Sequence, residues 1–297
     1  MAIDPRQITS ARLGPRSGGA PLIDTQKTSF EGAASMTFPP RPDRADAAPV
    51  AEIRANLAAV RARIDAACAA AGRPAHEVRL LPVSKTVAIP ALRAAVEAGI
   101  TTFGENKVQE ARLKAEALAD LPVHWSVIGH LQTNKAKYVA RFASEFQALD
   151  SLKVAAALDE RLQAEGRGLD VFVQVNTSGE ASKYGLAPDD VAGFVAELPA
   201  FASLRPRGLM TLAVFTQDEA QVRACFRLLR GLRDRLRETA PQGIRLDELS
   251  MGMSGDYEWA IAEGATVVRV GQAIFGRRPT PDGTYWPGLL PAAESVG

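Results

Sequence analysis

Apolar residues recur at three- and four-residue spacing from about residue 50, after a stretch that lacks this pattern. The residues that first carry the spacing are Ile53, Leu57, Val60 and Ile64. Such spacing places them on one face of a helix. Gly72-Arg73-Pro74 predicts the end of that helix, because glycine favours the position after a helix and proline cannot continue one. We therefore expect an amphipathic helix where the folded part of the chain begins.

Short apolar runs then alternate with segments of helical period. The expected strands are Val78–Val83, Thr101–Gly104, His124–Ile128, Phe146–Leu149, Asp170–Val175, Arg207–Leu212, Glu248–Met251 and Val267–Val270. The expected helices are 89–98, 106–119, 131–141, 152–166, 188–198, 218–239 and 256–263. Nearly continuous apolar strands indicate a parallel sheet covered by helices. Eight such units predict an α/β fold with a single (β/α)8 barrel of TIM type, rather than a doubly wound sheet, and no GxGxxG follows any strand.

The two ends of the chain differ from this regular part. Residues 1–49 are rich in Pro, Gly, Ser, Arg and Asp, and we expect them to form a disordered tail. Their acidic residues argue against a transit peptide, and Met36 is an alternative start. The barrel is expected to span residues 50–280, and residues 281–297 are expected to form a short C-terminal tail.

Charge and cysteine content narrow the classes of partner. The net charge of the 297 residues is +1, which argues against a nucleic acid or an anionic membrane and favours a small-molecule ligand. No apolar run reaches the roughly 18 residues of a membrane helix. Cys68 and Cys225 lack metal-ligand spacing, so we expect buried thiols, a reducing compartment and no metal site. A cytoplasmic location is the corresponding expectation.

Candidate chemistry follows the strands, since barrels carry their function at the carboxyl ends of strands. Lys85 follows the first strand, where it is either a partly desolvated nucleophile for an aldehyde or a solvated lysine. Asn106 follows the second and either donates a hydrogen bond or caps a helix. His130 follows the third and is either an acid/base group or a locally packed ring. Residues 176–184 form either a lid or a solvated connection.

The last two units contain small residues where an anion could bind. Ser250–Asp256 follows the seventh strand, and Gly271–Gly276 follows the eighth. Backbone N–H groups can approach an anion closely in such loops, and barrels often hold phosphate there. Ordinary glycine turns are the alternative. A reactive amine beside an anion cradle fits a ligand that carries both an aldehyde and a phosphate.

Six motifs in order then resemble a known family, the pyridoxal phosphate homeostasis proteins. These motifs are LLPVSKT (80–86), FGENKVQEA (103–111), HWSVIGHLQTNK (124–135), VNTSGEASKYGL (175–186), RGLMTL (207–212) and LSMGMSGDYEWAIAEGATVVRVGQAIFG (249–276). The resemblance covers about 50 to 278. It implies a barrel similar to the N-terminal domain of bacterial alanine racemase. The turn departs from the family pattern at Gly255, which leaves the anion donors in place.

The resemblance implies pyridoxal 5′-phosphate (PLP) as cofactor, held as an internal aldimine on Lys85. It implies that the phosphate lies at the SMGMS turn and the last motif, and that Arg269 faces the pyridine nitrogen. The residues implied in the pocket are Lys85, Asn106, His130, Ser250, Gly252, Ser254, Arg269 and Gly271.

An arginine at the pyridine nitrogen favours a carrier over a catalyst. Its permanent charge keeps the nitrogen unprotonated and weakens the ring as an electron sink. We expect a PLP carrier without significant catalysis, monomeric, that releases PLP to acceptors such as PLP-dependent apo-enzymes. One alternative is a low-activity racemase-like enzyme with His130 or Tyr184 as base. Another is an aldolase-like barrel without PLP, in which Lys85 attacks a sugar ketone.

Overall fold

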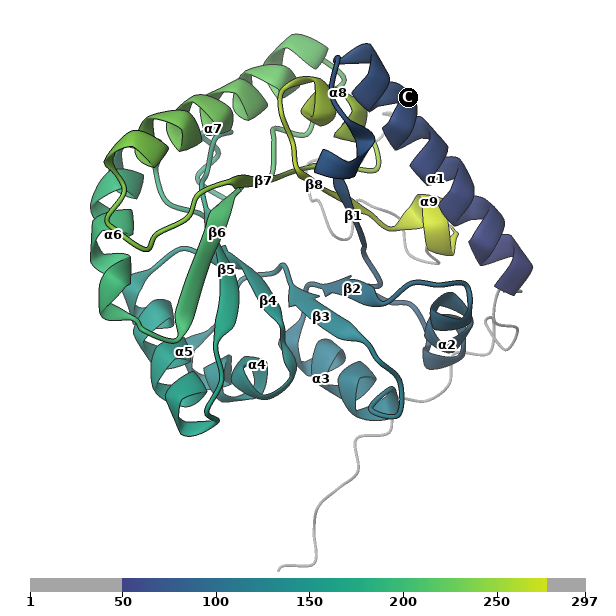
Figure 1. Ribbon diagram of the computed structural model, residues 1–297, viewed down its shortest axis with the longest axis horizontal. Coiled ribbons are helices and arrows are strands. Elements are labelled where there is room, and N and C mark those ends of the chain that lie inside the picture. Colours follow the sequence, from purple (N-terminus) through teal and green to yellow (C-terminus); the bar gives the residue numbers. More distant parts are fainter. Residues whose placement is uncertain (1–49, 277–297) are drawn as a thin grey trace, which may run out of the picture. The chain divides into compact units, whose positions relative to one another are not determined.

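Eight parallel strands surround a common axis in residues 50–276, the part of the chain described by the structure, a computed structural model (Figure 1). The strands are β1 (Arg79–Pro82), β2 (Thr102–Glu105), β3 (His124–Val127), β4 (Glu145–Leu149), β5 (Leu169–Gln174), β6 (Leu204–Met210), β7 (Glu248–Met253) and β8 (Val267–Val270). Their order in the sheet is β1-β8-β7-β6-β5-β4-β3-β2. β1 and β2 meet through a parallel bridge between Val83 and Gly104. The predicted (β/α)8 barrel is confirmed.

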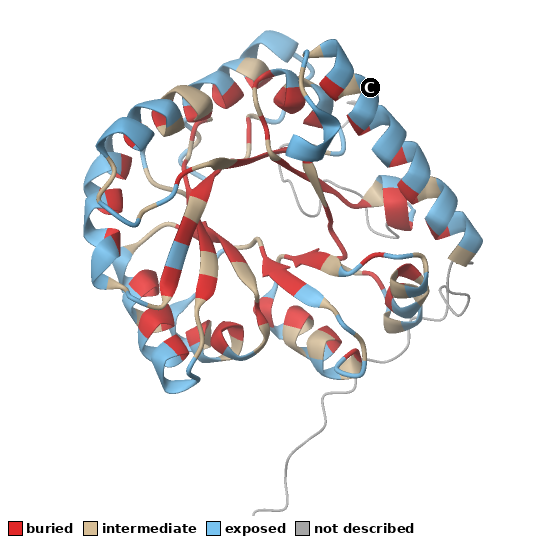
Figure 2. Cartoon of the chain, viewed as in Figure 1, coloured by how far each residue is buried: buried red, intermediate tan, exposed pale blue. Residues whose placement is uncertain are grey.

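Helices connect the strands and cover the outside of the barrel. They are α2 (Ile89–Glu97), α3 (Val108–Ala117), α4 (Ala136–Phe142), α5 (Leu152–Ala164), α6 (Val191–Glu197), α7 (Glu219–Thr239), α8 (Tyr257–Ala262) and α9 (Gln272–Phe275). Figure 2 shows that burial is concentrated in the strands and in the inward faces of these helices. Strand β5 is apolar and buried on both faces, as in Phe172 and Val173, because helices lie outside it.

An additional helix, α1 (Val50–Ala70), lies outside the ring beside α8 and α9 (Figure 1). Its buried stripe is Ile53, Leu57, Val60, Ile64 and Cys68. Two polar contacts fix its position, because Asn56 donates to the Ile274 carbonyl at 3.2 Å and Arg63 pairs with Glu258 at 2.9 Å. The N-terminal amphipathic helix predicted from the sequence is therefore confirmed.

The boundaries differ from the sequence prediction at several places. Strand β6 begins at Leu204, three residues before the expected start at Arg207. Pro206 is accommodated because the β5–β6 register shifts there, pairing Val171 with Pro206 and Phe172 with Gly208. Residues 272–275, expected as loop, form the short helix α9. The tails predicted at 1–49 and 281–297 lie outside the described residues.

Cys68 and Cys225 are buried thiols, as expected. Burial raises the pKa of the Cys68 thiol above its ordinary value. Within residues 50–276, no helix combines the length and the apolar composition needed to cross a bilayer. In the same range, no cluster of three His, Cys, Asp or Glu side chains is arranged to hold a metal ion.

Close contact between β6 and β7 makes Gly208 a position where alanine should destabilise the fold. A Cβ there would lie 1.9 Å from the Glu248 carbonyl oxygen, so the two strands would have to separate. We expect Gly208→Ala to cost about 1–3 kcal/mol of unfolding free energy. Thermal melting followed by circular dichroism measures this loss. Gly193→Ala is the matched control, because its Cβ meets no atom within 4 Å on helix α6. Equal melting of the Gly208 variant and wild type would refute the packing argument.

Candidate functional site

The residues predicted for the site lie near or after the carboxyl ends of strands, except Ser250, which lies within β7. Lys85 follows β1, and β1 lies between β8 and β2 around the barrel. Arg269 therefore comes from the strand on one side of Lys85, and Asn106 follows the strand on the other. The loop after β7 lies next to the end of β8, on the side away from β1. The barrel thus brings the amine candidate, the arginine and the glycine-rich loops to one end.

Hydrogen bonds to two carboxylates hold the residues on both sides of Lys85. Ser84 is fully buried and donates its hydroxyl to Glu105 at 2.6 Å. The Thr86 N–H donates to Glu110 at 2.7 Å. Thr86 has a φ of +66°, a conformation that a β-branched residue adopts only when its surroundings impose it. Lys85 itself is half-buried, and the contacts of its two neighbours fix its backbone.

Lys114 on α3 contacts the same three residues, Ser84, Glu105 and Glu110. Its ammonium is almost fully buried and donates to the Ser84 carbonyl at 2.7 Å, to Glu105 at 2.6 Å and to Glu110 at 2.7 Å. Burial raises the pKa of Glu105, and the charge of Lys114 opposes that rise. The second carboxylate oxygen of Glu105 has no hydrogen-bond partner among the described residues. Lys114 is thus the countercharge for two carboxylates that hold the Lys85 segment.

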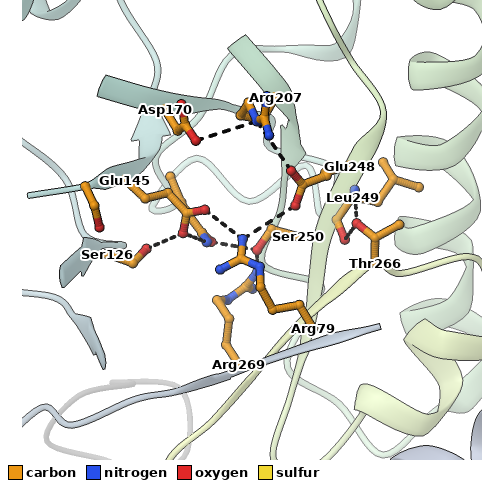
Figure 3. Close-up of polar contacts among 12 residues, drawn as sticks. Arg79, Ser126, Glu145, Asp170, Arg207, Glu248, Leu249, Ser250, Thr266 and Arg269 are labelled. Atoms are coloured by element: carbon orange, nitrogen blue, oxygen red, sulfur yellow. Dashed lines mark hydrogen bonds and ion pairs between the residues drawn. The ribbon is translucent and has the colours of Figure 1, made fainter. Parts of the chain in front are cut away.

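Arg269 is a buried cation inside the barrel, with only 3% of its surface exposed. Its two terminal nitrogens donate to the Ser250 hydroxyl at 2.7 Å and to the Thr211 carbonyl at 2.8 Å. Burial lowers the pKa of Arg269 to about 10, and the charge of Asp256 opposes this. The guanidinium therefore stays charged at neutral pH while neutral oxygens hold it (Figure 3).

Ser250 lies deeper than its motif suggested. Its side chain is fully buried, accepts from Arg269 and donates to Gln147 at 2.6 Å. The family resemblance implied a phosphate contact for this serine, but its hydroxyl contacts Arg269 inside the barrel (Figure 3). Its contribution to a ligand would therefore pass through the arginine.

The turn after β7 is tight and open to solvent at its tip. Gly252 has a φ of +94°, and a Cβ there would lie 2.6 Å from the Cβ of Ala260. The Met253 N–H donates to Asp256 at 2.5 Å, which fixes the turn, and burial raises the pKa of Asp256. Ser254 is exposed. A turn that admits no side chain at Gly252 presents its backbone, as an anion-binding loop does.

Gly271 follows β8 directly and is buried. It occupies the N-cap of α9, where its carbonyl accepts from the Ile274 N–H at 2.9 Å. Because β7 and β8 are neighbours, Gly271 lies at the same end of the barrel as Gly252 and Ser254. The two loops expected to cradle an anion are therefore adjacent.

Asn106 and His130 contribute to the same end in different ways. Asn106 is half-buried, and the N-cap of α3 is Lys107, so the capping interpretation of Asn106 does not hold. His130 stacks on Tyr184, with ring centroids 3.9 Å apart, and its Nδ1 lies 3.4 Å from Asp150. Burial raises the pKa of Asp150, and His130 opposes that rise. The histidine thus belongs to an acid/base cluster at the rim.

The loop after β5 is hydrogen-bonded to the barrel end rather than being a solvated connection. Thr177 contacts Thr211 through their hydroxyls at 2.9 Å, and Lys183 donates to the Ala213 carbonyl at 2.8 Å. The Asn176 amide donates to the Glu180 carbonyl at 2.9 Å. Since Tyr184 in this loop stacks on His130, the loop reaches from β5 toward the end of β3.

Sequence reasoning did not find Lys114, Gln147 or Asp150 as parts of this site. A signal existed for Lys114, because Glu110 and Lys114 are four residues apart on one helix face. Such pairs are common on solvated surfaces, so the spacing alone does not indicate burial. Nothing local marks Gln147, whose partner Ser250 is 103 positions away in the chain.

Comparison with known proteins places this geometry in a family. Over residues 55–279 the sequence matches the family described as alanine racemase, N-terminal domain. The pyridoxal phosphate homeostasis protein of Pseudomonas aeruginosa is 45% identical over 226 residues, which are 76% of this chain and 96% of that protein. The chain belongs to the pyridoxal phosphate homeostasis protein family. The protein of that name from Escherichia coli is 40% identical over 233 residues, 76% of this chain and 97% of that protein.

Solved structures agree with this assignment. The structure of PipY from Synechococcus elongatus with PLP bound is 36% identical, with a TM-score of 0.67, and the match covers 75% of this chain and all (100%) of that one. A protein of unknown function from Bifidobacterium adolescentis gives 38% identity and a TM-score of 0.73 over 77% of this chain and 97% of that one. Alanine racemase from Clostridium difficile, 14% identical with a TM-score of 0.63 over 78% of this chain and 58% of that one, shares the fold.

The Lys114 cluster yields a stability prediction with a defined pH dependence. Lys114→Met leaves the buried Glu105 carboxylate without its countercharge, and we expect a loss of about 3–5 kcal/mol at neutral pH. A carboxyl whose pKa rises on folding binds its proton more tightly in the folded state, so stability falls as pH rises through that pKa. The deficit should therefore shrink as the pH falls from about 8 toward about 5.

Thermal melts across this pH range measure the effect. Lys153→Met, on the exposed face of α5, is the matched control and should melt close to wild type. Glu105→Gln combined with Lys114→Met should recover part of the loss, because no charge is then buried. A deficit that does not change with pH would show that Glu105 is not the group left without a partner.

Proposed function

We propose that this chain binds PLP covalently through Lys85 and serves in the supply of PLP within the cell. Support comes from the named relatives, from the PipY structure that contains PLP, and from the arrangement of the described residues. The observation that carries the proposal is the position of Arg269. This buried cation lies on β8, the strand beside β1 and Lys85, and it donates to two neutral oxygens. Burying a charge is costly even when it is hydrogen-bonded, and such charges cluster at functional sites.

Lys85 supplies the covalent link in this proposal. Its amine nitrogen would form a C=N bond to the aldehyde carbon of PLP, and the aldehyde oxygen would leave as water with the two hydrogens of the amine. The attacking amine must be unprotonated to act as a nucleophile. The contacts of Ser84 and Thr86 fix the backbone from which this side chain extends. The lysine therefore starts close to its reactive position.

The remaining residues orient the ligand. Gly252, Ser254 and Gly271 offer backbone and hydroxyl donors to a phosphate at the ends of β7 and β8. PLP when bound supplies a pyridine ring that can accept electrons from a substrate carbon. The charge of Arg269 keeps a proton off the ring nitrogen and weakens that capacity. Asn106 and His130 would line the pocket wall.

A reactive lysine combined with a weakened electron sink favours carrying PLP over catalysing a reaction with it. A protein that forms the imine readily but stabilises a carbanion poorly can shield the aldehyde and release it to another amine. We propose PLP-dependent apo-enzymes as recipients, and a monomeric, cytoplasmic carrier remains our prediction.

Reductive trapping tests the covalent site. After incubation with PLP and borohydride, peptide mass spectrometry should find the pyridoxyl mass on the Lys85 peptide, and the visible absorbance band should disappear. Lys85→Ala should remove both signals without lowering the melting temperature of the apo-protein. Lys107→Ala is the matched control, since this exposed lysine follows the neighbouring strand, and it should retain the adduct. A protein that stays colourless and unlabelled would refute the proposal and favour an aldolase-like reaction of Lys85.

A racemase-like activity is the second candidate, and the cluster at the rim favours it. His130 lies against Tyr184 and within 3.4 Å of Asp150, an arrangement able to move a proton. Incubation with L-alanine in deuterated water measures α-proton exchange by NMR. The carrier proposal expects exchange no faster than with free PLP. Exchange at an enzymatic rate that His130→Ala abolishes would instead establish catalysis.

A further inference from the structure

A chain of buried polar groups crosses the barrel from Arg269 to the opposite end (Figure 3). Arg269 donates to Ser250 at 2.7 Å, and Ser250 donates to the Gln147 carbonyl oxygen at 2.6 Å. The Gln147 amide nitrogen then donates to Glu145 at 2.6 Å, whose other oxygen accepts from Arg79 at 2.7 Å. Ser250 and Gln147 are fully buried, so these bonds are made away from water.

The route of this chain is across the interior rather than along a strand pair. Ser250 lies on β7 and Gln147 on β4, and β6 and β5 separate these strands in the sheet. Their hydrogen bond therefore spans the barrel. Arg79 and Glu145 are the first residues of β1 and β4, so the chain ends at the amino ends of the strands, away from Lys85.

Gln147 decides the direction of the hydrogen bonds. A serine hydroxyl can rotate to donate to either neighbour. Because Gln147 presents its oxygen to Ser250 and its nitrogen to Glu145, the serine proton points to Gln147 and the serine lone pairs face Arg269. The Glu145 carboxylate accepts from the Gln147 nitrogen and pairs with Arg79, and because a carboxylate can only accept, this holds the amide in that orientation.

We propose that Gln147 is a positioning residue for the cofactor ring, acting through Ser250 on Arg269. The inference rests on the proposed function and extends it across the barrel to β4. With Ser250 fixed as an acceptor, the guanidinium has two anchored nitrogens, one on Ser250 and one on the Thr211 carbonyl. These two hydrogen bonds fix the plane of the guanidinium. They therefore also fix where its positive charge lies relative to the proposed pyridine ring.

Several charged groups lie along this series of hydrogen bonds, and each can affect how the absorbance of lysine-bound PLP depends on pH. They are Arg79 on β1, Glu145 on β4, Glu248 on β7, Asp256 in the turn before α8 and Arg269 on β8. Arg79 pairs with both Glu145 and Glu248, so the charges at the end of the hydrogen-bonded series away from Arg269 are paired. Asp256 is the carboxylate that acts on Arg269 electrostatically.

Gln147→Met tests the proposal, because it removes both amide atoms in a similar volume. The affinity for PLP should fall by up to about tenfold, the effect of losing the one hydrogen bond that fixes Ser250 behind Arg269. The pH midpoint of the visible absorbance of lysine-bound PLP should rise by about half a unit, since a loosened Arg269 opposes protonation less.

Ser126→Ala is the matched control. This buried hydroxyl donates to the same Glu145 oxygen at 2.6 Å but does not lie between Glu145 and Arg269. It should lower thermal stability and leave the affinity and the absorbance midpoint unchanged. An equal shift in Ser126→Ala and Gln147→Met would overturn the proposal, because general loosening of the core would then explain both.

A measurement without PLP separates this inference from the proposed function. In the apo-protein, the losses of melting temperature from Gln147→Met and Arg269→Met should be non-additive, because each breaks the same chain. Additive losses would overturn the positioning role even if PLP binds Lys85. Absence of any Lys85 adduct in wild type would refute the proposed function, and the same comparison would still decide whether Gln147 holds Arg269.

Discussion

The hydrogen bond from the Ser84 amide to the Gly104 carbonyl, 2.9 Å long, joins the first and last edges of the sheet. Pairing at this junction removes the free edges of β1 and β2 and fixes the residues after them relative to one another. Because Ser84 directly precedes Lys85, the contact that closes the barrel also places the candidate nucleophile. Buried charges reinforce this junction, since Lys114 holds the Ser84 carbonyl and the Glu105 carboxylate together.

Much of the fold could be predicted from the chain itself. Each β/α unit carries its own period, and the stripe through Ile53 and Leu57 specified helix α1. What escaped prediction depended on tertiary context. Pro206 lies inside β6 because a register shift in the pairing with β5 accommodates it, which no local pattern reveals. Residues 272–275 form a helix although four residues are too few to show a period.

The candidate site also contains residues that the sequence predicts and residues that only the tertiary structure reveals. Position after a strand was enough to select Lys85, His130 and the loops after β7 and β8, because a barrel gathers those ends whatever the sequence between them. The supporting residues are different, since Gln147 and Ser250 meet across the interior from distant parts of the chain. Motif similarity supplied Ser250 as a residue of interest, and only the structure shows that its hydroxyl contacts Arg269.

The left-handed backbone of Thr86 has a consequence for the timing of capture and release. A segment already held in an uncommon conformation loses little further freedom when a ligand arrives, so association carries a small entropic penalty. The same rigidity keeps the Lys85 backbone at the barrel mouth. If Lys85 binds PLP as proposed, an acceptor amine would have to reach the aldehyde carbon at that mouth, and the residence time of PLP would depend on the concentration of the acceptor.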